Sequence, residues 1–350
     1  MRKLFGLLPL VLASALGAAP PPKVSICVPV YNVESYVAAT LDSALNQTLR
    51  DIEIVCVDDG STDGSLAILK NYAAKDPRIK VLENGKNRGT LYTRQRSILE
   101  SSGVYVLCLD SDDELFPDAA RLAYEKAEET GVDVVLTLVH GTSENGTVDD
   151  ILSWKMGFGA VDRPRDGKEL LLHLAHLREF VWTLWDKLWR GENIRAAAGQ
   201  LMPFAEKNHI CISEDFLEYW YAAKNMKSYV VLPYVSHRYY VNRGATKRSK
   251  NRAATDKKFT GDVALVVGKI LADDRDLVEV LGTENVFWYF IPVVLRKVAA
   301  LPQKEGWASF DNYLAAFPLD MAGDVERAME RYNPSWYGSW RAAKAFSAGE

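Results

Sequence analysis

The stretch at residues 23–65, KVSICVPVYNVESYVAATLDSALNQTLRDIEIVCVDDGSTDGS, decides the fold class. Its apolar runs at 24–30 and 52–57 are typical of buried strands, and residues 33–45 between them carry apolar side chains at helical spacing. Further strands are expected at residues 79–82, 104–109 and 132–139, and further helices at residues 65–74, 91–100 and 119–129. This alternation predicts an α/β fold, with a mostly parallel sheet flanked by helices.

The chain has 350 residues and a formal net charge of −4, so its composition gives no reason to expect a nucleic-acid partner. We divide it into four parts. Residues 1–22 precede the fold, 23–140 form the strand–helix series, and 141–245 are rich in Trp, Tyr and His. Residues 246–350 form a mainly helical C-terminal extension.

The first residues, MRKLFGLLPLVLASALGAAPPPK, differ from the rest of the chain. Two basic residues precede an apolar run, small residues follow it, and three prolines then form a stiff linker. This pattern predicts a signal peptide, with an uncleaved anchor or a mis-assigned start as alternatives. A real signal places the protein in the lumen of the secretory pathway or outside the cell.

Polar residues follow each of the first four predicted strands, at Tyr31, at 58–61, at 87–89 and at 110–113. Ligands bind at the carboxyl ends of strands in such sheets. Crowded carboxylates repel one another unless a cation offsets them, and Mg²⁺ or Mn²⁺ typically joins one or two carboxylates to a substrate phosphate. The alternative for Asp113, Glu114 and Asp118 is that they begin a helix.

Six segments together resemble the family 2 glycosyltransferases of the GT-A fold, over about two thirds of the chain. They are residues 23–65, NRGTLYTRQRSI, LDSDDELFPD, WDKLWR, ISEDFLEYW and VSHRYYVNRG. The resemblance implies an inverting, metal-dependent transferase that moves a hexosyl or N-acetylhexosaminyl group from a UDP-linked donor to a glycan or glycoconjugate hydroxyl. Peripheral membrane association is also expected. A manganese-using enzyme of the Golgi or endoplasmic reticulum fits the secretory start, and the cytoplasmic face of a membrane is the alternative.

The resemblance also implies a role for each site residue. The donor-binding residues are Pro29, Tyr31, Asp58, Asp59, Arg94, Asp110 and Asp112, with Tyr31 against the base, Asp59 on its ring N–H and the Arg94 cation facing the diphosphate. The metal ligands are Asp112 and Asp113. The catalytic base is Asp215, beside Glu214. Since Ser213 precedes these two acids, they also fit the first turn of a helix.

Other classes of function stay open. One is a catalytically silent module that binds a nucleotide sugar or a glycan. It has the acidic residues that follow the predicted strands but has no catalytic base. A nucleotidyltransferase requires a Gly-rich, basic loop after the first strand, which PVYNVESY does not provide. The family often reads Ala-Arg-Asn where this chain has Thr93-Arg94-Gln95, so the donor pocket is expected to differ.

Several residues have a structural role as the alternative to a functional one. Trp182, Trp185 and Trp189 have helical spacing that favours core packing over an acceptor cleft. Residues 237–240 fit either a cover over the substrate or a strand. The four cysteines are expected to be free thiols, and His140 and His209 structural or exposed. Gly89 fits either a tight turn near the ligand or an ordinary loop. Glycosylation sequons begin at Asn46 and Asn145.

Overall fold

The computed structural model describes most of the chain. The described residues are 20–142, 148–151, 164–167, 171, 182–240, 243, 252–282, 286 and 290–348. The predicted signal segment up to residue 19 and the sequon at Asn145 lie outside them.

The described strands form one mixed sheet in the order β3-β2-β1-β4-β9-β6-β10-β5. Its first half is parallel and consists of β1 (Val24–Val30), β2 (Ile52–Asp58), β3 (Ile79–Glu83) and β4 (Tyr105–Cys108). These strands lie within two residues of the predicted ones. In the second half β6 (Val134–Thr142) runs parallel to β10 (Ser228–Tyr240). The antiparallel strands are β5 (Glu114–Leu115) at the edge, β7 (Val148–Ile151), β8 (Arg165–Asp166) and β9 (Lys187–Arg190).

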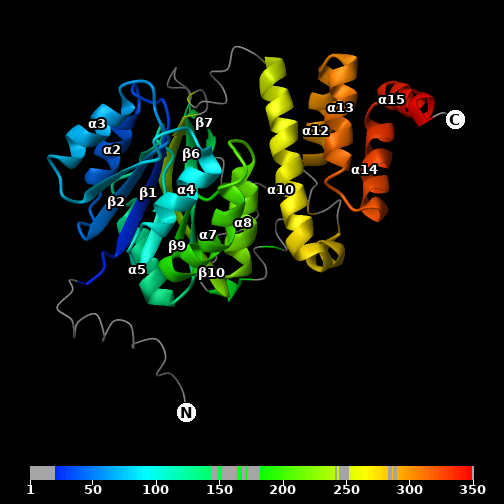
Figure 1. Ribbon diagram of the computed structural model, residues 1–350. Helices are drawn as coiled ribbons and strands as arrows, with labels where there is room; N and C mark the ends of the chain where they lie inside the picture. Colours follow the sequence, from blue (N-terminus) through cyan, green and yellow to red (C-terminus); the bar gives the residue numbers. More distant parts are fainter. Residues whose placement is uncertain are drawn as a thin grey trace.

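Two hydrophobic cores cover the two faces of the sheet, because successive residues of a strand point to opposite faces. On β1, Ile26 and Val28 join the core under α2 (Val37–Leu45), α3 (Ser65–Ala73) and α5 (Ala119–Thr130). Cys27 joins the core under α4 (Thr90–Leu99), α7 (Gly191–Ala205) and α8 (Glu214–Lys224). Figure 1 shows α2 and α3 on one side of the sheet and α7 and α8 on the other. The helices predicted between the first strands are therefore confirmed.

The C-terminal extension is helical in its described part, as predicted. It consists of α10 (Arg252–Leu281), α12 (Phe290–Ala300), α13 (Gln303–Leu314), α14 (Leu319–Tyr332) and α15 (Pro334–Ala348). Its apolar residues continue the core of α7 and α8, and α10 lies between the sheet domain and the other C-terminal helices (Figure 1). Where α10 bends at Asp274, this carboxylate accepts hydrogen bonds from Trp220 at 2.8 Å and Lys224 at 2.5 Å, both on α8.

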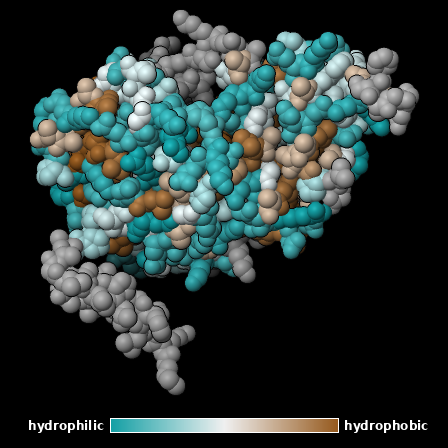
Figure 2. Space-filling view, viewed as in Figure 1, coloured by the Kyte–Doolittle hydropathy of each residue, from teal (hydrophilic) through white to brown (hydrophobic). Residues whose placement is uncertain are grey.

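The face of the molecule shown in Figure 2 is mostly hydrophilic, with separate small hydrophobic patches. Four large apolar side chains are exposed among the described residues, at Leu99, Leu265, Val280 and Tyr332. Within the same residues, none of the helices combines the length and apolar character that crossing a bilayer requires.

The helical packing predicted for the three tryptophans is wrong. Trp189 lies on β9, which pairs antiparallel with both β4 and β6, and Trp182 and Trp185 lie in the segment that leads into it. Trp182 and Trp189 are buried, so core packing holds for them without a helix. The four cysteines are free thiols, as expected.

Candidate active site

A cavity of about 490 Å³ opens at the carboxyl ends of β1, β2 and β4. This is the edge of the sheet where the sequence predicts a ligand. Its wall also includes residues from α4, from the loop before α8, from the end of β10 and from α10. Six predicted donor-binding residues line it: Pro29, Tyr31, Asp59, Arg94, Asp110 and Asp112.

The turn after β2 separates the two neighbouring aspartates. Asp58 is buried and does not line the cavity, because its Oδ2 accepts hydrogen bonds at 3.1 Å from the backbone N–H groups of Gly60 and Ser61. Asp59 reaches the wall. Its oxygens accept bonds from Asn84 at 2.7 Å and from the backbone of Gly89 at 3.0 Å.

Gly89 forms a tight turn, which is one of the two roles that the sequence allows. Its φ is +94°, and a Cβ there would lie 2.7 Å from the Ile210 carbonyl oxygen. Only glycine combines this backbone conformation with this close approach. The turn joins the loop after β3 to the loop before α8, so it brings two walls of the cavity together.

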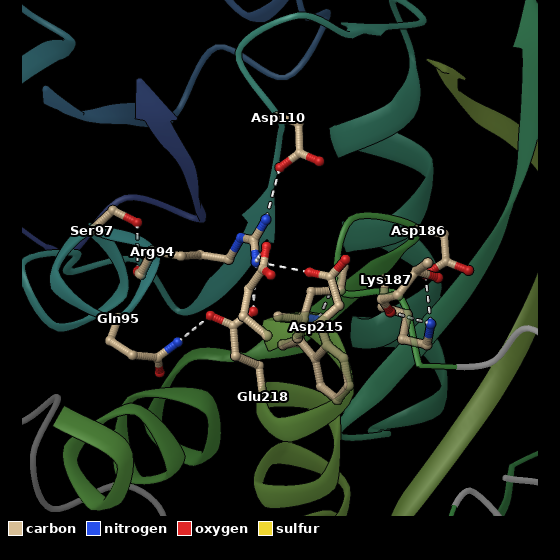
Figure 3. Close-up of polar contacts among 12 residues, drawn as sticks. Arg94, Gln95, Ser97, Asp110, Asp186, Lys187, Asp215 and Glu218 are labelled. Carbon is tan, nitrogen blue, oxygen red and sulfur yellow. Dashed lines mark hydrogen bonds and ion pairs between the residues drawn. The ribbon is translucent and has the colours of Figure 1, made fainter. Parts of the chain in front are cut away.

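Arg94 is the centre of an acidic cluster (Figure 3). Its guanidinium lies 2.6 Å from Glu218, 2.8 Å from Asp215 and 3.0 Å from Asp110. Glu214 is more distant, at 3.5 Å. The side chain of Arg94 is only 3% exposed, so four carboxylates share one buried cation.

Burial raises the pKa of the three carboxyls on α8 in spite of the cation. It raises the pKa of Glu214 well above its ordinary value and raises that of Asp215, and it brings the pKa of Glu218 to about 7. Arg94 opposes each rise because its positive charge favours the ionised form. The cluster therefore retains protons at a pH where exposed carboxyls have lost them.

The predicted base and its neighbour lie on the first turn of α8, where the sequence also allows a helix start. Ser213 does not cap this helix with its side chain, and its φ is +65°. Glu214 lines the cavity and Asp215 lies just beyond its wall, with 26% of its side chain exposed. The structure thus places Asp215 beside the cavity rather than inside it.

Asp113 is 3% exposed, and its Oδ1 accepts a hydrogen bond at 2.9 Å from the backbone N–H of Tyr240. Burial raises its pKa well above the ordinary value. It does not begin a helix, since α5 begins at Ala119 and Glu114 lies on β5. Asp110 and Asp112 are the carboxylates of this segment that line the cavity.

The side chains at the end of β10 differ in their positions. His237 is buried, with Nδ1 2.6 Å from Ser236 Oγ, and burial lowers its pKa to about 3. It is neutral and does not cover a substrate. Tyr239 and Tyr240 form a strand, as expected, but line the cavity instead of packing only on the core. Trp185 stacks on Tyr239 with ring centroids 5.5 Å apart.

Two functional features were not predicted from the sequence. Glu218 holds Arg94 and accepts a 2.5 Å hydrogen bond from Gln95. Its position three residues after Asp215, on the same face of a helix, was a usable signal. Asp186 and Lys187 form a fully buried ion pair at 2.5 Å. The positive charge of Lys187 partly opposes the rise that burial causes in the pKa of Asp215.

The loop before α8 is fixed from two sides. The Ile210 carbonyl accepts a hydrogen bond from the backbone N–H of Leu91, at the start of α4. Asp262 of α10 accepts bonds from the backbone N–H groups of Cys211 at 3.1 Å and Ile212 at 3.2 Å. Lys258, also on α10, donates to the His209 carbonyl at 2.6 Å. The C-terminal extension therefore forms part of the site.

Asp110 and Asp112 are the residues that could hold a metal ion on the cavity wall. No group of three or more His, Cys, Asp and Glu side chains gathers as a ligand set in the described parts of the chain. A cation that takes one or two carboxylates and completes its shell with substrate phosphate does not need such a group. The donor set thus fits Mn²⁺ or Mg²⁺ bound together with a diphosphate.

Comparison with known proteins agrees with this geometry. Residues 25–176 match the family described as Glycosyl transferase family 2. Chondroitin synthase of Escherichia coli is 32% identical over 201 residues, which are 54% of this chain and 28% of that protein. Poly(ribitol-phosphate) beta-glucosyltransferase of Bacillus spizizenii is 31% identical over 229 residues, which are 61% of this chain and 34% of that protein. Residues 25–176, which are less than half of the chain, are therefore similar to the family 2 glycosyltransferases.

Solved structures share the fold. The crystal structure of S. aureus TarS superposes with a TM-score of 0.59 at 19% identity, over 92% of this chain and 55% of that one. TarS 1–349 in complex with UDP-GlcNAc gives a TM-score of 0.55 over 92% of each chain. The predicted GT-A fold is confirmed. This chain spans about a third of the length of the chondroitin synthase and of the poly(ribitol-phosphate) beta-glucosyltransferase.

Proposed function

We propose that the protein transfers a sugar, with inversion, from a nucleoside-diphosphate sugar to a hydroxyl of a glycan or glycoconjugate. The observation that carries this proposal is the arrangement of acids around Arg94. Asp110 contacts the guanidinium from the donor cavity at 3.0 Å, and Asp215 contacts it at 2.8 Å from beyond the cavity wall. Donor and base are thereby held on two sides of one buried cation.

A UDP-linked hexose or N-acetylhexosamine is the donor that we propose. The cavity of about 490 Å³ is within the range of small-molecule sites. Tyr31 and Asp59 lie on its wall, where they are available to a nucleobase. The UDP-GlcNAc complex of TarS and the glucosyltransferase relative support this donor class.

Asp215 is the general base in this proposal. Its side chain is 26% exposed, so an acceptor hydroxyl can reach it. One carboxylate in that position suffices for a single in-line displacement, because it takes the hydroxyl proton as the oxygen attacks the anomeric carbon. Burial raises the pKa of Asp215, which makes it a stronger base than an exposed aspartate.

Asp110 and Asp112 are proposed to hold the metal–diphosphate, and Asp113 remains a predicted ligand. A bound Mn²⁺ or Mg²⁺ supplies positive charge that stabilises the departing diphosphate. The acidic wall disfavours a free diphosphate by repulsion, so we expect donor binding to depend on the divalent ion.

The test uses the full-length protein, a panel of nucleotide sugars, and Mn²⁺ or a chelator. We expect metal-dependent binding of one donor and slow release of its sugar to water. Asp215→Asn should keep donor binding and lose at least about 100-fold in turnover, the usual contribution of a general base. A protein that binds a donor without turning it over is the silent binding module. A protein that binds no nucleotide sugar refutes the proposal.

A further inference from the structure

Three basic side chains lie on the wall of the donor cavity in the described part of the chain: Arg94, Lys258 and Arg243. A diphosphate brings at least two negative charges to a wall that already carries Asp110, Asp112 and Glu214. Protein cations near a diphosphate offset this repulsion through charge-assisted hydrogen bonds. The question is which of the three cations is available for them.

Arg94 and Lys258 are engaged by other groups. Three carboxylates lie within 3.0 Å of the Arg94 guanidinium, which is almost completely buried. The Lys258 ammonium donates to Asp262 and to the His209 carbonyl oxygen. Turning either cation toward a diphosphate breaks an ion pair. The buried carboxylate then has no cation to offset its charge, which is costly.

Arg243 is held mainly by aromatic rings. Its guanidinium carbon lies 3.4 Å from the ring centroid of Tyr240 and 4.8 Å from that of Tyr36. Its Nε is buried and has no hydrogen-bond partner among the described residues. Rings fix the plane of a guanidinium through cation–π contact but do not accept its in-plane N–H groups as a carboxylate does.

In the part of the chain that the structure describes, the carboxylate at ion-pair distance from Arg243 already has other hydrogen-bond partners. Glu114 lies 4.0 Å from Arg243, the limit of an ion pair. Its Oε1 accepts a 2.7 Å hydrogen bond from the Tyr240 hydroxyl, and its Oε2 accepts a 3.2 Å bond from Arg238. Within the described ranges, the Arg243 guanidinium is thus the one of the three cations that has no close carboxylate partner, and its buried Nε has no acceptor.

We propose that Arg243 binds the diphosphate of the donor, with its fork of N–H groups on the phosphate oxygens. This inference rests on the proposed function and adds a residue to it. Arg243 lines the same cavity as Tyr31, which is proposed to contact the nucleobase, and Asp112, which is proposed to hold the metal ion. The aromatic contacts fix its orientation before the donor arrives, which lowers the entropy lost on binding.

The experiment compares UDP with uridine, which lacks the phosphates, by calorimetry on the full-length protein with Mn²⁺; GDP and guanosine replace them if UDP does not bind. The variants are Arg243→Gln and Arg243→Lys. Arg238→Gln is the matched control, because Arg238 contacts the same Glu114 but does not line the cavity. We expect Arg243→Gln to lose about 10- to 100-fold in affinity for the diphosphate, the range of a charge-assisted hydrogen bond, and to keep affinity for the nucleoside. Arg243→Lys should recover part of the loss, and Arg238→Gln should match the wild type.

Two results overturn the inference while the proposed function stands. One is an unchanged affinity of Arg243→Gln for the diphosphate. The other is an equal loss for diphosphate and nucleoside, which makes Arg243 a residue that only shapes the pocket. A wild-type protein that binds neither UDP nor GDP refutes the proposed function, and the inference with it.

Discussion

Replacing Glu218 by glutamine removes one charge from the buried cluster and keeps its shape. Glu218 is 2% exposed and contacts Arg94 at 2.6 Å and Gln95 at 2.5 Å. In Glu218→Gln the new side-chain oxygen can still accept from Arg94. Its amide can donate to Gln95 once the Gln95 amide turns over. The variant therefore tests the charge of this position rather than its packing.

The expected effect follows from the pKa of Glu218, which burial raises from 4.5 to about 7. The folded state keeps a proton that the unfolded state has lost, so the wild type loses stability as pH rises from about 4.5 to about 7. Each pKa unit corresponds to about 1.4 kcal/mol. The glutamine does not titrate. The free energy of unfolding of the variant, relative to the wild type, should therefore rise by on the order of 2–3 kcal/mol between about pH 5 and pH 8.

Urea denaturation of the full-length protein, followed by tryptophan fluorescence at several pH values, measures this difference. Glu279→Gln is the control, because Glu279 is 47% exposed in a surface ion pair with Arg275 and should show no comparable change. Parallel pH profiles for the wild type and Glu218→Gln refute the reasoning, because Glu218 then does not titrate in this range.

Two further predictions concern stability. Gly89→Ala should destabilise the protein by about 1 kcal/mol or more beyond Gly85→Ala in thermal or urea unfolding, because both glycines have positive φ but only Gly89 meets a backbone oxygen, that of Ile210; equal losses contradict this account. Burial lowers the pKa of His237 to about 3, whereas the unfolded chain takes up a proton below the ordinary pKa of 6.5. His237 should therefore lower the free energy of unfolding of the wild type by about 2 kcal/mol at pH 5. His237→Gln should lose correspondingly less stability between pH 7 and pH 5 in urea titrations, and an equal loss in both proteins shows that His237 is not the acid-sensitive group.

The sequence predicted the first half of the fold because its signals there are local. The strands β1, β2 and β4 are mainly apolar runs closed by polar residues, and the helices between the first strands have clear periodicity. The acidic tips could be placed at one edge because parallel strands end together. Gly89 could be assigned to a turn because glycine there has a direct backbone reason.

The remainder depends on contacts between distant segments. Trp185 and Trp189 have a spacing that fits a helix, yet β9 forms because β4 and β6 both offer it backbone hydrogen bonds. Arg94 was predicted to face the donor diphosphate. The structure surrounds its guanidinium with carboxylates from α8, more than 100 residues further along the chain. No local pattern reports such a contact, since it depends on how α4 and α8 pack against each other.

The attachment of α10 to the loop before α8 limits how this protein can be engineered. Asp262 binds the backbone of Cys211 and Ile212, and Ala254, Thr255 and Lys258 line the donor cavity. Shortening the protein to its sheet domain would remove one wall of the cavity and release the loop that orients the acids of α8. Chimeras with relatives should therefore exchange α8 and α10 together as one segment, with the crossover placed before residue 209.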